Sequence, residues 1–345
     1  MKNDEVQVCV VGAGRAGVIH ARAITRTPGA RLAAIVDSNE DACKTVCREL
    51  GAARSYPEYL GAIENPDIDA VIIATPTRLH YEIVVAAAKA GKHILCEKPM
   101  AMNPAQCEEM VQAAQVNHIK LQIGFMRRFD EGFRRAKGIV QRGQIGQVVL
   151  VKSLTHGPST PKRWQYDISG SNGPLAEVNS HDIDTLRWFT ESEFAKVYAI
   201  AGNYRCPEAR DEFPDFYDNV SLVASFENGM QGMIDGAVSV KYGYDARAEV
   251  LGTEGVLSVG QLAHHSVFTC TRHGEIVRPA VSSWRDLFAD AYVAEDKAFI
   301  ASIRDNTDPV VGGYDGMMVV KVVEAGNQSI REGRPVCLNT QSQAV

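Results

Sequence analysis

Long hydrophobic runs are absent from this 345-residue chain, in which no apolar stretch approaches the roughly 18 residues that a membrane-spanning helix requires. Basic runs are absent too, and a formal net charge of −6 argues against nucleic acid and anionic membranes as partners. Residues 1–5 lead straight into a predicted strand, with no signal peptide before it. We therefore expect a cytoplasmic protein that acts on small molecules.

Cysteine is scattered rather than clustered. Cys43 and Cys47, the only close pair among eight cysteines, lie one helical turn apart, which fits neither a zinc ribbon nor a Cys-x-x-Cys redox motif. No second histidine or cysteine stands at ligand spacing from His181, and the adjacent His264 and His265 are expected to point to opposite sides of a strand. The sequence predicts reduced thiols and no bound metal ion.

A glycine-rich loop follows the first predicted strand, residues 6–11. The loop reads Gly12-Ala13-Gly14-Arg15-Ala16-Gly17, and a helical stretch comes after it. In this G-x-G-x-x-G pattern the first glycine makes a tight turn, the second lets the main chain approach a pyrophosphate, and the third packs the helix against the strand. The next strand ends in Asp37, where an acid is expected to bind the ribose hydroxyls. The pattern predicts a dinucleotide site, and a plain βαβ unit is the alternative.

Asp37 also indicates which dinucleotide binds. A carboxylate there accepts a hydrogen bond from the adenosine 2′-hydroxyl and repels a 2′-phosphate. Residues 38–41 contain no arginine that would compensate. We therefore expect NAD rather than NADP.

Strands and helices alternate along the first third of the chain. Buried strands are expected at residues 70–74, 92–96 and 121–124, and helices at about 79–90 and 104–117. This alternation predicts a doubly wound parallel sheet of about six strands, a Rossmann domain over residues 1–124. The carboxyl edge of that sheet is expected to carry the glycine loop, Thr75-Pro76 and Lys98.

Lys98 directly follows one of these strands and precedes Pro99, which ends the strand. Ligands bind at this edge of an open parallel sheet, so the ammonium group is expected at the mouth of a cleft. There it can donate a hydrogen bond to a substrate hydroxyl or to a developing alkoxide. On its own, however, Glu97-Lys98-Pro99 is more typical of a solvated loop.

The character of the chain changes after residue 124. Strand-like segments are expected at residues 147–154, 219–226 and 232–240, and helices at residues 131–141, 285–305 and 315–331. Few helices separate the strands, and Asn228-Gly229 marks a hairpin turn. Residues 125–345 are therefore predicted to form an α+β domain with a large, mostly antiparallel sheet.

One polar constellation in this second domain has the residue types for catalysis. Residues 173–188 begin with Gly-Pro, which suits the first turn of a helix, and helical spacing places Glu177, His181 and Asp184 on one face. A carboxylate one turn from a histidine orients the ring and raises its basicity, as a general acid or base requires. A solvated polar helix face is the alternative interpretation.

The chain resembles the Gfo/Idh/MocA oxidoreductases nearly end to end, and among them it looks most similar to the inositol dehydrogenases. The matching segments are Gly12-x-Gly14-x-x-Gly17, Ala74-Thr75-Pro76, Glu97-Lys98-Pro99, residues 124–130, residues 177–184, Tyr217-Asp218-Asn219, residues 242–245, residues 284–295 and the isolated His156. The resemblance implies an NAD-dependent dehydrogenase in which Lys98 and His181 flank the carbon that loses hydride. It also implies association through the exposed face of the antiparallel sheet, and we expect a homotetramer.

The motifs and the resemblance together assign residues to three roles. The cofactor residues are Gly12, Gly14, Arg15, Ala16, Gly17, Asp37, Thr75, Pro76, His80, Glu97 and Lys98. The catalytic residues are Lys98, His181 and Glu177, the last as a support for His181. The substrate residues are Lys98, Arg127, His156, Trp164, Asn179, His181 and Tyr244. Of these, Trp164 either stacks on a sugar face or packs on the surface.

The chain departs from the family at Glu177 and Asn179, where the helix usually carries Asp and Gly. The longer carboxylate and the added amide shift the hydrogen-bonding atoms by about one methylene group, enough to change which hydroxyl is held for hydride transfer. We expect oxidation of a secondary hydroxyl of a cyclitol or pyranose. The alternatives are oxidation of the 3-hydroxyl of a glycoside and, in another class, an NAD-binding regulatory protein without turnover. Whether NAD dissociates after each turnover also stays open.

Overall fold

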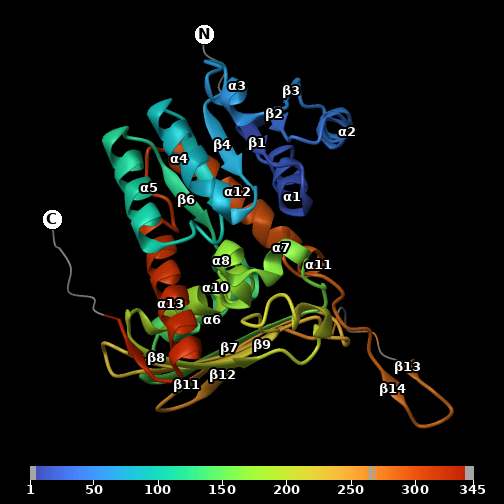
Figure 1. Ribbon diagram of the computed structural model, residues 1–345, viewed down its shortest axis with the longest axis vertical. Coiled ribbons are helices and arrows are strands. Elements are labelled where there is room, and N and C mark those ends of the chain that lie inside the picture. The colour runs from blue at the N-terminus through green and yellow to red at the C-terminus, as the bar shows by residue number, and fades with distance from the viewer. Residues whose placement is uncertain (1–4, 264–266, 268, 339–345) are drawn as a thin grey trace. The chain divides into compact units, whose positions relative to one another are not determined.

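The computed structural model describes residues 5–263, 267 and 269–338 and divides into two compact units (Figure 1). The first unit comprises Met1–Phe129 and Ala289–Val320, and the second comprises Asp130–Phe288 and Lys321–Val345. Among the helices of the described residues, none combines the length and the apolar character that crossing a membrane would take.

A six-stranded parallel sheet forms the centre of the first unit. Its strands are β1 (Val6–Val11), β2 (Ala30–Val36), β3 (Arg54–Tyr56), β4 (Ala70–Ile73), β5 (His93–Glu97) and β6 (Leu121–Gly124). They lie in the order β3-β2-β1-β4-β5-β6, so the direction of winding reverses between β1 and β4. The predicted doubly wound sheet is confirmed, and ligands bind outside the carboxyl ends of the strands at such a reversal.

Helices connect the strands of this sheet. They are α1 (Arg15–Ile24), α2 (Glu40–Leu50), α3 (Tyr59–Ile63), α4 (His80–Lys89) and α5 (Pro104–Val116), with the 3₁₀ turns η1 (Thr77–Leu79) and η2 (Met126–Phe129). The Asn39 side chain caps α2 by accepting a hydrogen bond from the Ala42 N–H (3.0 Å). Gly51, with φ at +73°, ends the same helix in the left-handed conformation that favours glycine. The local sequence therefore sets both ends of α2.

Helix α12 (Ala289–Arg304) comes from far along the chain but belongs to the first unit. It packs against α1, and its Phe299 and Ile300 are buried in one core with Val8 and Ile35 of the sheet. Figure 1 shows α12, in orange, beside the blue α1. The predicted domain boundary places this helix in the second domain, whereas the core of the Rossmann domain includes it.

A seven-stranded mixed sheet forms the centre of the second unit. Its strands are β7 (Val148–Gly157), β8 (Phe194–Gly202), β9 (Asn219–Phe226), β10 (Gln231–Val238), β11 (Asp245–Gly252), β12 (Val256–Val259) and β15 (Val336–Cys337). Their order is β12-β11-β7-β10-β9-β8-β15, in which β7 and β10 run parallel and the other pairs antiparallel. The predicted α+β domain with a mostly antiparallel sheet is confirmed.

Helices lie over one face of this sheet (Figure 1). The remaining elements are α6 (Glu131–Gln141), α7 (Arg163–Tyr166), α8 (Ile168–Ser171), α9 (Gly173–Glu177), α10 (Ser180–Thr190), η3 (Pro207–Ala209), β13 (Thr269–Cys270), β14 (Ile276–Val277), α11 (Trp284–Leu287) and α13 (Gly313–Glu332). Side chains alternate along β7, so that Ser153 and Thr155 are buried against α10 while Lys152 is exposed on the opposite face.

The single helix predicted over residues 173–188 is wrong. The chain forms two helices here, α9 and α10, with Val178 and Asn179 between them. The N–H groups of both residues turn back to the Pro174 carbonyl oxygen, at 2.9 and 3.1 Å, and so close α9. Glu177 and His181 therefore lie on different helices, and the spacing of one helical turn does not relate them.

Candidate functional site

Gly12, in the loop between β1 and α1, and Gly17, in the first turn of α1, have no room for a side chain. A Cβ on Gly12, whose φ is +109°, would lie 2.6 Å from the Ala74 carbonyl oxygen, and one on Gly17 would lie 1.8 Å from the Gly12 carbonyl oxygen. Gly14 differs, because a Cβ there would meet nothing within 4 Å. The loop is therefore packed tightly on its inner side and open at Gly14, where a ligand can approach the main chain.

This loop leads into the N-terminus of α1. The Val18 N–H donates to the Gly14 carbonyl oxygen (3.0 Å) within the first turn, and the N–H groups that precede it have no acceptor in their own helix. Gly14 and Arg15 are exposed. The outward N–H groups and the helix dipole both favour an anion. The arrangement fits the pyrophosphate of a dinucleotide.

Asp37 lies just past the carboxyl end of β2, beside the loop. Its Oδ2 accepts a hydrogen bond from the Ala13 N–H (2.7 Å), and its Oδ1 accepts one from the Asn39 N–H (2.8 Å). These bonds fix the orientation of the half-buried carboxylate. Each oxygen has a further lone pair for a ribose hydroxyl. The position of Asp37 therefore fits the predicted hydrogen bonds to the ribose hydroxyls of a dinucleotide.

Lys98 is half-buried and lies one residue past the carboxyl end of β5. Its N–H donates to Oε2 of Glu97 (3.0 Å), and a cis peptide bond joins it to Pro99. His80 bridges this turn to the neighbouring strand, with its Nδ1 2.9 Å from the Pro99 carbonyl oxygen and its Nε2 2.9 Å from the Thr75 carbonyl oxygen. The lysine turn and the end of β4 are therefore fastened together at one edge of the sheet.

His80 and Glu97 both make hydrogen bonds within the protein at the cofactor edge, and their contact with NAD stays a prediction. Both ring nitrogens of the buried His80 face carbonyl oxygens, which only accept hydrogen bonds. The buried Glu97 carboxylate is directed at His20 and at the Lys98 main chain. Thr75, in contrast, has a buried hydroxyl without a hydrogen-bond partner among the described residues, and so it retains capacity for a ligand.

His181 is buried in the first turn of α10 in the second unit. The next residue, Asp182, fastens this turn to β7, because its Oδ1 accepts from the Ser153 hydroxyl (2.6 Å) and its Oδ2 from the Thr155 hydroxyl (2.7 Å). Asp182 is completely buried, and these bonds offset the loss of its hydration. The main chain that carries His181 is therefore held firmly against the sheet.

Asn179 is buried between α9 and α10, and its contact with substrate stays a prediction. Its Nδ2 donates to Oδ2 of Asp182 (2.8 Å), and the whole residue is buried. It packs against Gly236, where a Cβ would come within 2.2 Å of Asn179 Oδ1. The helix is interrupted before α10, and the side-chain amide of Asn179 points into the interior. Glu177, at the end of α9, remains half-buried and accepts a hydrogen bond from Gln165 Nε2 (3.4 Å).

His156 lies on the face of the sheet opposite α10. Its Nε2 is 3.1 Å from Oδ1 of Asp235, and its Nδ1 is hydrogen-bonded to the Tyr242 hydroxyl. Thr155, the preceding residue, contacts Asp182, and successive side chains of a strand point to opposite faces. The predicted grouping of His156 with His181 is therefore not found.

The other predicted substrate residues are distributed over both units. Tyr244 is buried, with its ring edge-on to that of Phe288 at 6.5 Å. Trp164 is 39% exposed on α7, and Arg127 is buried in η2 of the first unit. The predicted strand positions of His264 and His265 fall outside the described residues.

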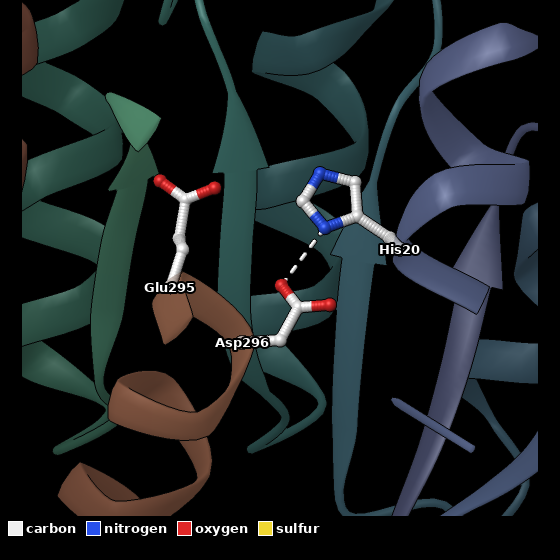
Figure 2. Close-up of side chains that lie close together, drawn as sticks. All are labelled: His20, Glu295 and Asp296. Atoms are coloured by element: carbon white, nitrogen blue, oxygen red, sulfur yellow. Dashed lines mark hydrogen bonds and ion pairs between the residues drawn. The ribbon is translucent and has the colours of Figure 1, made fainter. Parts of the chain in front are cut away.

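A buried charged cluster in the first unit was not predicted from the sequence. His20 of α1 contacts Glu97 and Asp296. Figure 2 shows His20 and Asp296 with Glu295 beside them. Two signals were present: a lone histidine in the small-residue helix after the glycine loop, and two adjacent acids within the largely apolar α12. Neither signal identifies the partners, because hydrogen bonds between distant parts of the chain leave no local pattern.

Comparisons with known proteins match this chain along most of its length. A family model described as an oxidoreductase family with an NAD-binding Rossmann fold matches residues 6–125. A second family model, the GFO/IDH/MocA C-terminal domain, matches residues 133–258. The chain is 32% identical over 333 residues to a myo-inositol 2-dehydrogenase of Thermotoga maritima, with 96% of this chain and 98% of that protein covered. It is 30% identical over 341 residues to a scyllo-inositol 2-dehydrogenase (NAD(+)) of Bacillus subtilis, with coverage of 98% and 97%.

A solved structure is similar over the same extent. The crystal structure of a scyllo-inositol dehydrogenase from Lactobacillus casei, with NAD(H) and scyllo-inositol bound, matches with a TM-score of 0.87 at 28% identity. The match covers 96% of this chain and 99% of that one.

Proposed function

Because the chain belongs to the GFO/IDH/MocA family of NAD-binding oxidoreductases, we propose that it oxidises a secondary hydroxyl of a ring polyol, an inositol or a related pyranose, with NAD as the hydride acceptor. The observation that carries the proposal is the placement of Lys98 at the carboxyl edge of the same sheet whose glycine loop suits a dinucleotide. The full-length similarity to inositol dehydrogenases supports the choice of substrate. A cytoplasmic location stays a prediction from the sequence.

The residues that would hold NAD belong to the carboxyl edge of the first unit. They are Gly12, Gly14, Arg15, Ala16 and Gly17 at the pyrophosphate, Asp37 at the ribose, and Thr75 and Pro76 at the end of the next strand. When bound, NAD supplies the carbon that accepts hydride from the substrate.

The chain supplies the groups that handle the proton and the developing charge. His181 takes the proton of the reacting hydroxyl as a general base. Lys98 donates a hydrogen bond to the same oxygen as it gains negative charge, and the carbon that bears it loses hydride and becomes a carbonyl carbon. Glu177 supports His181. The proposed contacts to the other substrate hydroxyls are Arg127, Trp164 and Tyr244.

The test of this function is the appearance of NADH when the protein is mixed with NAD and a panel of myo-inositol, scyllo-inositol, free pyranoses and glycosides. We expect turnover with at least one inositol. Turnover with glycosides alone would assign the glycoside 3-dehydrogenase reaction instead. A protein that binds NAD but turns over no member of the panel, even when a ketone is added to reoxidise a retained cofactor, would be a regulatory NAD-binding protein.

Asp37 should set the choice between NAD and NADP. Its fixed carboxylate accepts hydrogen bonds from the ribose and repels a 2′-phosphate, so we expect NAD to bind at least about tenfold more tightly than NADP, or about 1.4 kcal/mol. Calorimetric titration of each cofactor measures the ratio. Asp37→Ser should bring the dissociation constants of NAD and NADP closer together. Asp41→Ser, at the exposed start of α2, should leave their ratio unchanged. Equal dissociation constants in the wild-type protein would contradict this role of Asp37.

The uncovered face of the second unit's sheet is apolar across neighbouring strands. Tyr198 of β8, Val223 of β9 and Met233 of β10 lie opposite one another in register, and each is more than a third exposed. Ile200, two residues along β8, is 58% exposed. A contiguous apolar patch of this kind marks a protein interface more often than a solvated surface. We propose that a second copy of the chain covers this face and that the assembly is a homotetramer.

Val223→Asp should break this assembly, because it places a carboxylate at the centre of the apolar face. Light scattering should give the wild-type protein four times the chain mass of 37.6 kDa and the variant a smaller multiple. Val116→Asp, at a 68% exposed position of α5 in the first unit, is the control and should keep the wild-type mass. A wild-type protein that is monomeric at micromolar concentration would refute the assembly.

A further inference from the structure

Four ionisable side chains are buried together inside the first unit, and Figure 2 shows three of them, His20, Glu295 and Asp296. His20 comes from α1, Glu97 from β5, and Glu295 and Asp296 from α12, and solvent barely reaches any of them. Taking an ionised group out of water is costly unless it is paired and hydrogen-bonded. The groups of this cluster therefore depend on hydrogen bonds and ion pairs with one another.

His20 bridges two of the carboxylates. Its Nδ1 lies 2.8 Å from Oδ1 of Asp296, and its Nε2 lies 3.1 Å from Oε1 of Glu97. Burial raises the pKa of Asp296, although the charge and hydrogen bond of His20 act in the opposite direction. An ionised carboxylate only accepts hydrogen bonds, so the ring carries a proton on each nitrogen that faces one. Burial lowers the pKa of His20, but the charges and hydrogen bonds of Asp296 and Glu97 outweigh burial and raise this pKa well above its ordinary value.

Glu97 connects His20 to Lys98, because one of its carboxylate oxygens contacts the ring and the other contacts the lysine main chain. Burial raises the pKa of Glu97, but the hydrogen bond and charge of His20 outweigh that effect and lower the pKa, so Glu97 is ionised. Its other oxygen, Oε2, accepts the main-chain N–H of Lys98 at 3.0 Å. Gly124 leaves room for the carboxylate, because a Cβ there would lie 3.2 Å from Glu97 Oε2. A continuous row of hydrogen bonds thus runs from Asp296 to the main chain of Lys98.

Glu295 stands outside this row. Its carboxyl oxygens have no hydrogen-bond partner among the described residues, and burial raises its pKa well above the ordinary value. His20, Glu295 and Asp296 also have the spacing of a metal site, with one ligand-type atom each within 4.8 Å of the others. The geometry argues against a metal ion, because His20 needs both ring nitrogens for the carboxylates.

We propose that His20 is a positioning residue for Lys98, which it holds through Glu97, and that Asp296 in turn holds His20. The inference rests on the proposed function, in which Lys98 stabilises the alkoxide. A displacement of about 1 Å at reacting groups can lower a rate by about a hundredfold, so the anchorage of the lysine main chain bears directly on turnover. The two ends of the row lie on segments that are distant in sequence, and the fold of the first unit brings them together.

Two substitutions break the row at different points without removing a large side chain. We expect His20→Gln and Glu97→Gln each to lower kcat by about tenfold or more, while the dissociation constant of NAD changes by less than about threefold. Glu295→Gln is the matched control, because it makes the same substitution at an equally buried position and does not interrupt the row. It should keep kcat within about twofold of the wild-type value.

Hydrogen–deuterium exchange gives a second measurement that needs no turnover. The hydrogen bond to Glu97 Oε2 protects the Lys98 amide hydrogen from exchange. The next residue, Pro99, has no amide hydrogen, so exchange at this turn, followed in a peptide that includes Lys98, reports on this bond. We expect exchange of the Lys98 amide to be about tenfold faster or more in His20→Gln and Glu97→Gln, and unchanged in Glu295→Gln. If His20→Gln does not fold, Glu97→Gln and Asp296→Asn carry the same test.

Several results would overturn the proposal. Unchanged exchange of the Lys98 amide in both His20→Gln and Glu97→Gln would do so. An equal loss of kcat in the control Glu295→Gln would also do so, because it would mean that any change in this buried cluster lowers kcat through packing alone. A stoichiometric metal ion in the purified wild-type protein would do so as well. If the wild-type protein oxidises no inositol or sugar, the proposed function fails, and the exchange measurement still decides whether His20 positions Lys98.

Discussion

Replacing Lys98 or His181 with alanine should lower kcat by about a hundredfold or more, the usual scale for losing an oxyanion donor or a proton-transfer group. The half-buried Lys98 is held at the sheet edge by its own main chain, and His181 lies in a helical turn that Asp182 fixes to β7. Either truncation therefore removes a functional group and leaves its support in place. Steady-state kinetics with an inositol and NAD measure the loss.

The two substitutions should leave NAD binding nearly unchanged, because the pyrophosphate and ribose contacts belong to the glycine loop and Asp37. The double variant should lose less than the product of the single losses, since both groups act on one transition state. Lys89→Ala, at the exposed end of α4, is the control for removing a surface lysine. If Lys98→Ala instead weakened NAD binding strongly and left kcat unchanged, Lys98 would be a cofactor clamp, and the mechanism would be wrong.

Gly17→Ala should damage both the stability of the first unit and its affinity for NAD. The added Cβ would lie 1.8 Å from the Gly12 carbonyl oxygen and 3.5 Å from the side chain of Val10, so α1 must move away from β1. Overpacking typically costs about 1–3 kcal/mol, and main-chain atoms give way less easily than side chains. We expect the melting temperature to fall by at least about 5 °C and NAD affinity by about a hundredfold. Calorimetry with and without NAD measures both quantities.

Gly14→Ala separates binding from stability in the same loop. Its φ of −74° suits any residue, and a Cβ there meets nothing within 4 Å, so the melting temperature should stay at the wild-type value. The methyl group lies where the pyrophosphate approaches, and NAD affinity should fall by about tenfold. Wild-type NAD affinity in Gly14→Ala would mean that the phosphates do not bind over this loop. A wild-type melting temperature in Gly17→Ala would contradict the close packing of α1 on β1.

Features that depend on neighbouring residues could be predicted well from the sequence. The bounds of α6 and β9 agree with the predicted ranges, because hydrophobic spacing and local caps mark them. Asp130, for example, accepts a hydrogen bond from the Phe133 N–H (3.0 Å) at the start of α6. The glycine pattern was equally predictable, since the spacing of its residues is local and Gly17 is required by a contact with Gly12 within one βαβ unit. The contact that requires Gly12, with Ala74 beyond β4, is not local.

Features that depend on distant packing could not be predicted in this way. The break between α9 and α10 is accompanied by buried bonds from Asp182 to β7, which the helical spacing of Glu177 and His181 does not reveal. The place of α12 depends on Phe299 filling the Rossmann core, and hydrophobic periodicity says only that the helix has a buried face. The side of the sheet on which His156 lies, in contrast, follows from strand alternation. Once Thr155 of β7 is known to face α10, the next residue must point to the opposite face.

The first unit is assembled from two segments of chain, with residues 130–288 between them. During translation its parallel sheet leaves the ribosome long before α12 is made, so the nascent domain lacks Phe299 and Ile300 from its core and Asp296 from the side of His20. Its exposed apolar surface is then a substrate for chaperones. A messenger that ends prematurely within residues 130–288 yields a Rossmann domain without α12. The complete core of the NAD domain therefore exists only once the chain has been made through α12.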